Sequence, residues 1–190
     1  MRIKDENSIL VLVNKKNWLS KNYVPYDLVE PKVNFLPDTN PEAKFLRKEC
    51  AKALEKLFKK AKKDKINLYA VSGYRSYKRQ GEIFKSNLKK DGEEANKYSA
   101  RPGQSEHQTG LAIDVTCEEI EFELSKSFEK TTTYDWLFMN AYKYGFIFRY
   151  PKNKEEITGY IFEPWHLRYL GKEVAEKLHL EDLALEEYIK

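Results

Sequence analysis

Three residues with metal-binding side chains stand out in the sequence: His107, Asp114 and His166. His107 precedes a Gly turn in SEHQTGLAIDV, and Asp114 lies near the end of the apolar run that follows. In a strand starting at Leu111, alternation places Asp114 and the small Ala112 on the same face. Catalytic zinc typically takes three protein ligands and keeps a fourth position open. These residues are therefore candidate zinc ligands, and a buried His–Asp pair is the alternative that they leave open.

Two further residues would complete a zinc peptidase site. Glu163 in EPWH, three residues before His166, is the candidate general base, because an attacking water needs a proton acceptor. Arg75 follows a predicted strand and a Gly turn in SGYRSYKRQ, where its guanidinium could bind a carboxylate through two hydrogen bonds. Gln80 could add amide hydrogen bonds from the first turn of the next helix. A surface ion pair is the alternative for Arg75.

The hydrophobic patterns around these residues predict mixed secondary structure. Asn40 and Pro41 predict the start of an amphipathic helix that runs to about Ala61, after a proline-rich, extended lead-in. The other predicted helices cover 77–92, 132–145 and one or two short stretches within 172–190. Predicted strands cover 9–14, 67–74, 111–115, 146–151 and 160–169. This order predicts an α+β fold with a small, mainly antiparallel sheet flanked by helices.

Length and composition predict one domain that spans residues 1–190. The 190 residues are 41% hydrophobic and 34% charged, which is typical of a globular chain with a heavily charged surface. The net charge of +4 comes without any nucleic-acid-binding motif, so we expect no nucleic-acid partner. Cys50 and Cys117 are expected to be free core thiols. No signal peptide or membrane span is recognisable, which predicts a cytoplasmic protein; a trimmed form would face the cell wall.

Several motifs resemble, in order and spacing, the VanY-type D-alanyl-D-alanine carboxypeptidases and the related LD-carboxypeptidases. They are SGYRS, SARPGQSEHQTGLAIDV, YGFIFRYP, KEEITGY and EPWHLRYLG, and they extend from about Val71 to Gly171. The resemblance implies a catalytic core at about 67–171 and a bound zinc ion. It implies that His107, Asp114 and His166 bind the zinc and that Glu163 is the general base. It further implies a substrate pocket lined by Arg75, Gln80, Ser105, Tyr150 and Trp165.

The expected function is removal of the C-terminal D-alanine from peptidoglycan stem peptides or their precursors by a monomeric zinc enzyme. Cleavage of tetrapeptides by LD-carboxypeptidase activity and hydrolysis of free D-Ala-D-Ala use the same chemistry and are the alternatives. A peptidoglycan-binding module without catalytic activity is the alternative from another class. The presence of all three candidate ligands and the candidate base argues against that module.

Overall fold

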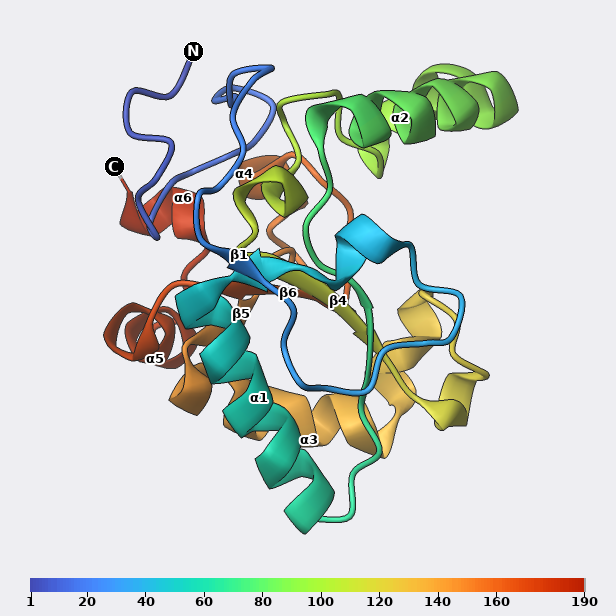
Figure 1. Ribbon diagram of the computed structural model, residues 1–190, viewed down its shortest axis with the longest axis vertical. Helices are drawn as coiled ribbons and strands as arrows, with labels where there is room; N and C mark the ends of the chain where they lie inside the picture. The colour runs from blue at the N-terminus through green and yellow to red at the C-terminus, as the bar shows by residue number, and fades with distance from the viewer. Residues whose placement is uncertain (190) are drawn as a thin grey trace.

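The candidate residues lie on and around a four-stranded antiparallel sheet with the strand order β3-β4-β6-β5 (Figure 1). The strands are β3 (Tyr69–Ser72), β4 (Ala112–Thr116), β6 (His166–Tyr169) and β5 (Phe146–Phe148). A separate antiparallel ribbon pairs β1 (Leu28–Val29) with β2 (Leu46–Arg47). This computed structural model describes residues 1–189. The predicted α+β class with a small antiparallel sheet is confirmed.

Helices surround this sheet. The α-helices are α1 (Lys48–Lys63), α2 (Tyr77–Asp91), α3 (Thr132–Asn140), α4 (Glu155–Thr158), α5 (Lys172–Leu180) and α6 (Leu185–Tyr188). Short 3-10 helices are η1 (Pro41–Lys44), η2 (Gly92–Lys97), η3 (Glu106–Thr109), η4 (Glu118–Ile120), η5 (Lys126–Lys130) and η6 (Ala141–Tyr144). In Figure 1, α1 and α3 lie below the sheet, whereas α2 projects at the upper right. Within residues 1–189, no helix combines the length and the apolar character needed to cross a bilayer.

The central strand β4 separates the hydrophobic core from the candidate site. Its residues Ile113 and Val115 are fully buried in the main core, where α1 contributes Leu54 and Leu57. Asp114, which alternates with them, lies on the opposite face and lines a cavity. The alternation predicted for this strand is therefore confirmed, and the same short segment anchors the core and presents a carboxylate.

The predicted strand at 9–14 is wrong, because these residues form no strand. Val11 and Val13 are buried, as their apolar character suggested. The backbone carbonyls of Ile9 and Val11, however, each accept a hydrogen bond of 2.9 Å from Nη2 of Arg168. A buried guanidinium thus satisfies backbone groups that a neighbouring strand would otherwise pair.

The predicted helix start at Pro41 and the predicted strand at 160–169 also need correction. Asn40 does cap a helix, but this is the 3-10 helix η1; α1 begins at Lys48, after β2. The intervening backbone is extended because it pairs with β1 and because the amide of Tyr74 donates to the carbonyl of Phe45. Only the last four residues of 160–169 form a strand, after a turn that contains Pro164. Proline cannot donate to a strand ladder, so pairing begins after it.

The remaining helix predictions are confirmed. Ser76 caps α2 through its side chain, and this helix ends at Gly92 as predicted. The helix predicted at 132–145 is α3 continued by η6, and Gly145 ends it with a φ of 91°. Cys50 and Cys117 are buried free thiols. His179 stacks on Tyr142 with ring centroids 4.0 Å apart.

Candidate functional site

All nine predicted site residues line one cavity of about 340 Å³. They are Arg75, Gln80, Ser105, His107, Asp114, Tyr150, Glu163, Trp165 and His166. They come from six separate parts of the chain: the loop after β3, α2, the turn around η3, β4, the turn after β5, and the segment that leads into β6 and includes its first residue. Residues more than ninety positions apart, such as Arg75 and His166, therefore contribute to a single concave site.

The three candidate metal ligands are buried close together. Asp114 of β4 is the cross-strand partner of His166 on β6, and His107 belongs to η3 just before β4. One carboxylate oxygen of Asp114 lies 3.0 Å from Nδ1 of His166, and the other lies 3.2 Å from Nε2 of His107. One donor atom from each residue lies within 4.8 Å of the other two. Two imidazole nitrogens and a carboxylate oxygen are a donor set that suits Zn²⁺.

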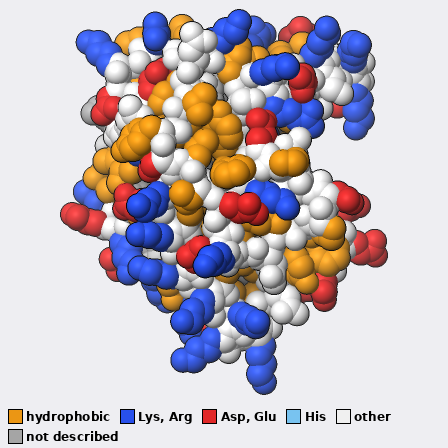
Figure 2. Space-filling model, viewed as in Figure 1, with side chains coloured by type: hydrophobic (Ala, Val, Ile, Leu, Met, Phe, Trp, Pro, Cys, Tyr) orange, Lys and Arg blue, Asp and Glu red, His pale blue; other side chains and the backbone are white. Residues whose placement is uncertain are grey.

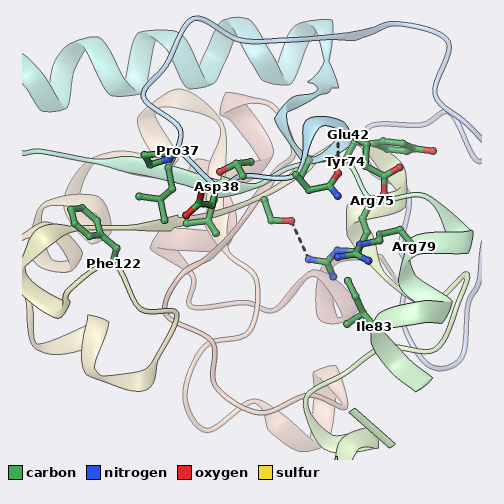
Figure 3. Close-up of a pocket in the computed structure, with 14 residues that line it drawn as sticks. Pro37, Asp38, Glu42, Tyr74, Arg75, Arg79, Ile83 and Phe122 are labelled. Carbon is green, nitrogen blue, oxygen red and sulfur yellow. Dashed lines mark hydrogen bonds between the residues drawn. The ribbon is translucent and has the colours of Figure 1, made fainter. Parts of the chain in front are cut away.

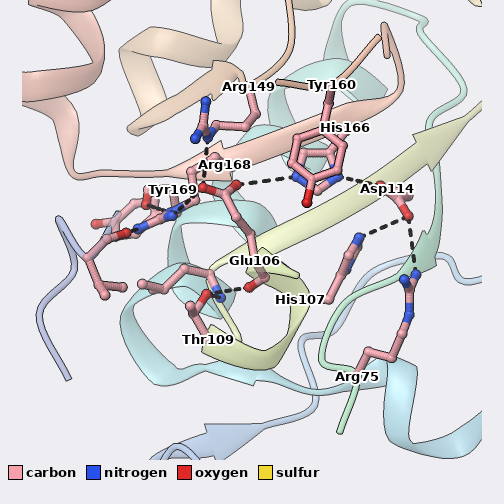
Figure 4. Close-up of polar contacts among 12 residues, drawn as sticks. Arg75, Glu106, His107, Thr109, Asp114, Arg149, Tyr160, His166, Arg168 and Tyr169 are labelled. Carbon is pink, nitrogen blue, oxygen red and sulfur yellow. Dashed lines mark hydrogen bonds and ion pairs between the residues drawn. The ribbon is translucent and has the colours of Figure 1, made fainter. Parts of the chain in front are cut away.

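The second nitrogen of each histidine ring contacts a protein acceptor. Nδ1 of His107 lies 2.7 Å from the carbonyl oxygen of Gly73, and Nε2 of His166 lies 3.4 Å from a carboxylate oxygen of Glu106 (Figure 4). Hydrogen bonds from these nitrogens leave Nε2 of His107 and Nδ1 of His166 as the metal-facing atoms. Metal-binding histidines in proteins use their second nitrogen in this way. These three residues therefore fit a zinc ion.

The close contacts shift the pKa values of the three groups in the metal-free protein. Burial alone would raise the pKa of Asp114, but the two histidines hold it well below its usual range. Burial also lowers the pKa of His107, and the nearby Arg75 adds to this effect. For His166, hydrogen bonds to Asp114 and Glu106 outweigh burial and raise the pKa to about 9. At neutral pH without metal, His166 therefore carries a proton that a metal ion must displace.

Glu163 differs from the other two carboxylates that line the cavity, because its pKa is raised whereas the pKa values of Glu106 and Asp114 are lowered. Its position is set by the backbone, because its amide donates to the carbonyl of Tyr150 and its carbonyl accepts from the amide of His166. The side chain is buried, and this burial, reinforced by the charge of Asp114, raises its pKa to about 7 despite the opposing charges of His166 and Arg75. A carboxylate with a pKa near neutrality is well suited to accept and return a proton.

Arg75 and Gln80 form a fixed pair beside the candidate metal ligands. The Nη1 atom of Arg75 donates to the Gln80 side-chain oxygen at 3.0 Å, and its Nη2 atom donates to the hydroxyl of Ser72 at 3.1 Å. Nη2 also lies 3.8 Å from Asp114. The amide nitrogen of Gln80 donates to the carbonyl of Ala100. Gln80 therefore holds the guanidinium in place, and the surface ion pair that was the alternative for Arg75 is not what the structure contains.

The other predicted pocket residues provide walls. The Tyr150 ring packs against His166, with the ring centroids 5.0 Å apart, and burial raises the pKa of its hydroxyl well above the ordinary value. The phenol is therefore neutral and able to donate a hydrogen bond. Trp165 lines the cavity and also packs against the main core. Ser105 is buried immediately before η3.

Sequence reasoning missed the buried charged cluster behind His166. Glu106, Arg149 and Arg168 are almost completely inaccessible, and one carboxylate oxygen of Glu106 lies 2.7 Å from a guanidinium nitrogen of each arginine. The sequence contained a sign of this cluster, because Glu106 lies within the SEHQTG motif beside His107 and the two arginines interrupt apolar strand sequences. The sequence pattern does not reveal that both arginines pair with Glu106.

A second, largely apolar cavity of about 470 Å³ adjoins the first (Figure 3). Both cavities are lined by Arg75 and Ile83, whereas Phe122 lines only the apolar cavity and Leu124 only the cavity with the candidate ligands. Arg75 therefore stands at the junction of the two hollows. On the face shown in Figure 2, Lys and Arg side chains are interleaved with acidic ones and do not gather in one continuous patch.

Comparison with known proteins finds a matching family and similar sequences. The sequence model of the family described as VanY, D-alanyl-D-alanine carboxypeptidase, matches residues 43–172. The "Putative carboxypeptidase YodJ" of Bacillus subtilis (strain 168) is 50% identical over 189 residues, which cover 99% of this chain and 69% of that protein.

Two solved structures are similar in fold. The LdcB LD-carboxypeptidase superposes with a TM-score of 0.94 at 50% identity, covering 99% of this chain and 88% of that chain. A variant of the D,D-pentapeptidase VanY from the VanB-type resistance cassette, in complex with Zn(II), superposes with a TM-score of 0.77 at 32% identity, covering 98% and 100%. The expected zinc cofactor agrees with that complex and with the His–Asp–His cluster. The chain belongs to the VanY family of D-alanyl-D-alanine carboxypeptidases.

Proposed function

We propose that this protein is a zinc carboxypeptidase that removes the C-terminal D-alanine from peptidoglycan stem peptides or their precursors. The observation that carries the proposal is the convergence of two histidines, one aspartate and a carboxylate of raised pKa on one cavity that also contains a fixed arginine. We assign His107, Asp114 and His166 as the zinc ligands. The bound ion supplies a Lewis acid, which polarises a carbonyl group and acidifies water.

The other side chains of the cavity supply the proton transfer and the substrate contacts. Glu163 takes the proton of the attacking water and passes it to the nitrogen of the leaving D-alanine, which its pKa of about 7 favours. Arg75, held by Gln80 and Ser72, places a positive charge where the substrate carboxylate or the developing oxyanion lies. Tyr150, Ser105 and Trp165 border the bound peptide, and the neutral hydroxyl of Tyr150 is a further donor.

The same chemistry serves three substrates, and we propose terminal D-Ala-D-Ala of pentapeptides as the first. LD-carboxypeptidase action on tetrapeptides is a second candidate, favoured by the similarity to LdcB over nearly the whole chain. Hydrolysis of the free D-Ala-D-Ala dipeptide is a third. The zinc-loaded protein should be incubated with dipeptide, tetrapeptide and pentapeptide, and the products identified by mass. Release of D-alanine from any of them supports the carboxypeptidase, and the preferred peptide assigns the specificity.

A matched variant makes this assay decisive. Glu163→Gln removes the proton acceptor but none of the three ligands, so it should keep one zinc per chain and lose at least about a hundredfold in kcat. Turnover at the wild-type rate would contradict the role of Glu163. No D-alanine release by the zinc-loaded wild type from any of the three peptides would instead favour a peptidoglycan-binding module without catalytic activity.

We further propose that residues 67–171 form the catalytic core of a single zinc peptidase domain that acts as a monomer. Every residue lining the cavity lies between Arg75 and His166. Size-exclusion chromatography with light scattering tests the monomer. A dimer that dissociates with loss of activity would contradict it.

A further inference from the structure

Glu106 is a fully buried carboxylate that lies directly behind one candidate zinc ligand. Its side chain belongs to η3, the same short helix that carries His107, yet it points toward the other histidine (Figure 4). One of its oxygens lies 3.4 Å from Nε2 of His166. The mechanism proposed above gives Glu106 no role, although a buried carboxylate is costly to keep without partners.

Two buried arginines hold this carboxylate in place. The other oxygen of Glu106 accepts from Nε of Arg149 and from Nη1 of Arg168, both at 2.7 Å. The Arg168 guanidinium is anchored in turn by backbone carbonyls of the N-terminal segment. The Arg149 guanidinium is anchored by Glu186 of α6, with contacts of 2.6 and 2.8 Å. The two oxygens of Glu106 therefore have different roles, because one binds the arginines and the other faces His166.

We propose that Glu106 is a positioning residue that accepts the Nε2–H hydrogen bond of His166 and so keeps the Nδ1 lone pair of that ring directed at the zinc. His107 has an equivalent acceptor, the backbone carbonyl of Gly73, which no side-chain substitution removes. Loss of such an outer acceptor typically weakens metal binding by about 10 to 100-fold. This inference rests on the zinc site proposed above.

The network offers a matched pair of variants. Glu106→Gln removes the carboxylate that contacts both Arg149 and His166. Glu186→Gln removes a carboxylate that contacts the same arginine but, in α6, does not contact His166. Both variants disturb the arginine network, but only the first changes the acceptor of the histidine. A purely structural role of Glu106 predicts that zinc affinity follows stability in both variants.

The test is a zinc titration of the full-length protein against a chromophoric chelator, with thermal unfolding of the same samples. Glu106→Gln should weaken zinc binding by about 10 to 100-fold, whereas Glu186→Gln should change it by less than about threefold even where it lowers the unfolding temperature. In the zinc-loaded protein, proton–nitrogen NMR should show a slowly exchanging Nε2–H of His166 in wild type and in Glu186→Gln. This signal should broaden in Glu106→Gln.

Two results would overturn the proposal: unchanged zinc affinity in Glu106→Gln, or equal weakening in both variants. If Glu106→Gln does not fold, Glu106→Asp is the variant that tests the proposal. It keeps the buried negative charge, but its shorter side chain moves the carboxylate oxygen away from His166. Its zinc affinity should fall by at least about fivefold, and wild-type affinity there would overturn the proposal. Zinc binding by the wild type in the same titration tests the site itself, so failure of the site and failure of the positioning role are distinguishable.

Discussion

Asp114 and His166 are cross-strand partners on β4 and β6, and Nδ1 of His166 lies 3.0 Å from a carboxylate oxygen of Asp114. The strand register alone thus brings together two candidate zinc ligands that are 52 residues apart in the sequence. The same carboxylate contacts His107 through its other oxygen. Asp114 therefore holds both candidate histidine ligands through its two carboxylate oxygens.

This arrangement predicts that zinc affinity depends strongly on pH. Because the pKa of metal-free His166 is about 9, its Nδ1 proton must leave before zinc binds. Apparent affinity should rise by about tenfold for each pH unit between about pH 7 and 8.5 and level off above the pKa of His166. Zinc titration calorimetry in buffers of different ionisation enthalpy measures the released proton. His179→Ala, outside the cavity, is the control and should keep the same slope; a flat profile in wild type would contradict the assigned protonation.

Glu163→Gln should stabilise the metal-free protein at alkaline pH. The pKa of Glu163 is raised from 4.5 to about 7 in the folded protein, so folding disfavours its ionised form. This effect does not destabilise the protein below pH 4.5. The destabilisation increases as the pH rises toward 7 and is constant at higher pH. We expect the variant to gain about 3 kcal/mol in the free energy of unfolding at pH 8 and less than about 1 kcal/mol at pH 5.

Urea unfolding with a chelator present measures this difference at both pH values. Glu82→Gln, at an exposed position on α2, is the matched control and should stay within about 0.5 kcal/mol of wild type at either pH. A gain that is equal at pH 5 and pH 8 would show that packing, and not charge, is responsible.

Arg75→Lys should lower kcat/KM by about a hundredfold without loss of zinc. A lysine ammonium cannot keep the two fixed contacts that the guanidinium makes with Gln80 and Ser72. Gln80→Ala keeps the positive charge of Arg75 but removes the hydrogen bond that holds its guanidinium in place, so a smaller decrease in kcat/KM of about tenfold is expected. Steady-state kinetics with metal analysis checks both variants. Arg79→Ala, at an exposed position on α2, serves as control. Wild-type activity in Arg75→Lys would exclude a role for the planar guanidinium of Arg75.

Tyr150→Phe should lower kcat by at least about tenfold with little change in KM or unfolding temperature. The variant keeps the ring that packs on His166 and removes only the buried hydroxyl, which the raised pKa keeps neutral and able to donate. Tyr134→Phe, in which the ring packs on Phe128 and Phe148, controls for loss of a phenol elsewhere. If kcat of Tyr150→Phe equals that of wild type, Tyr150 is a packing residue alone.

Local sequence patterns predicted the secondary structure well where a helix-terminal residue or a strand alternation sets the backbone conformation. Ser76 and Gly92 set the limits of α2, and the alternation around Ile113 and Asp114 separates core from cavity in β4. The predictions failed where tertiary contacts decide the backbone conformation. At Ile9 and Val11, the Arg168 guanidinium takes the carbonyls that would define a strand, and only the folded chain brings that guanidinium there.

The sequence by itself supplied the chemical hypothesis for this site. By residue type His107, Asp114 and His166 are candidate zinc ligands and Glu163 is a candidate proton acceptor. The resemblance of their motifs to the VanY-type carboxypeptidases is what implies zinc-dependent hydrolysis. Only the tertiary structure decided how these groups are supported. Buried electrostatic contacts depend on distances of a few ångströms between residues distant in sequence, and these distances pair Glu106 with His166 and with two arginines. No local pattern contains such distances, so the carboxylate behind the candidate ligand His166 became visible only in the fold.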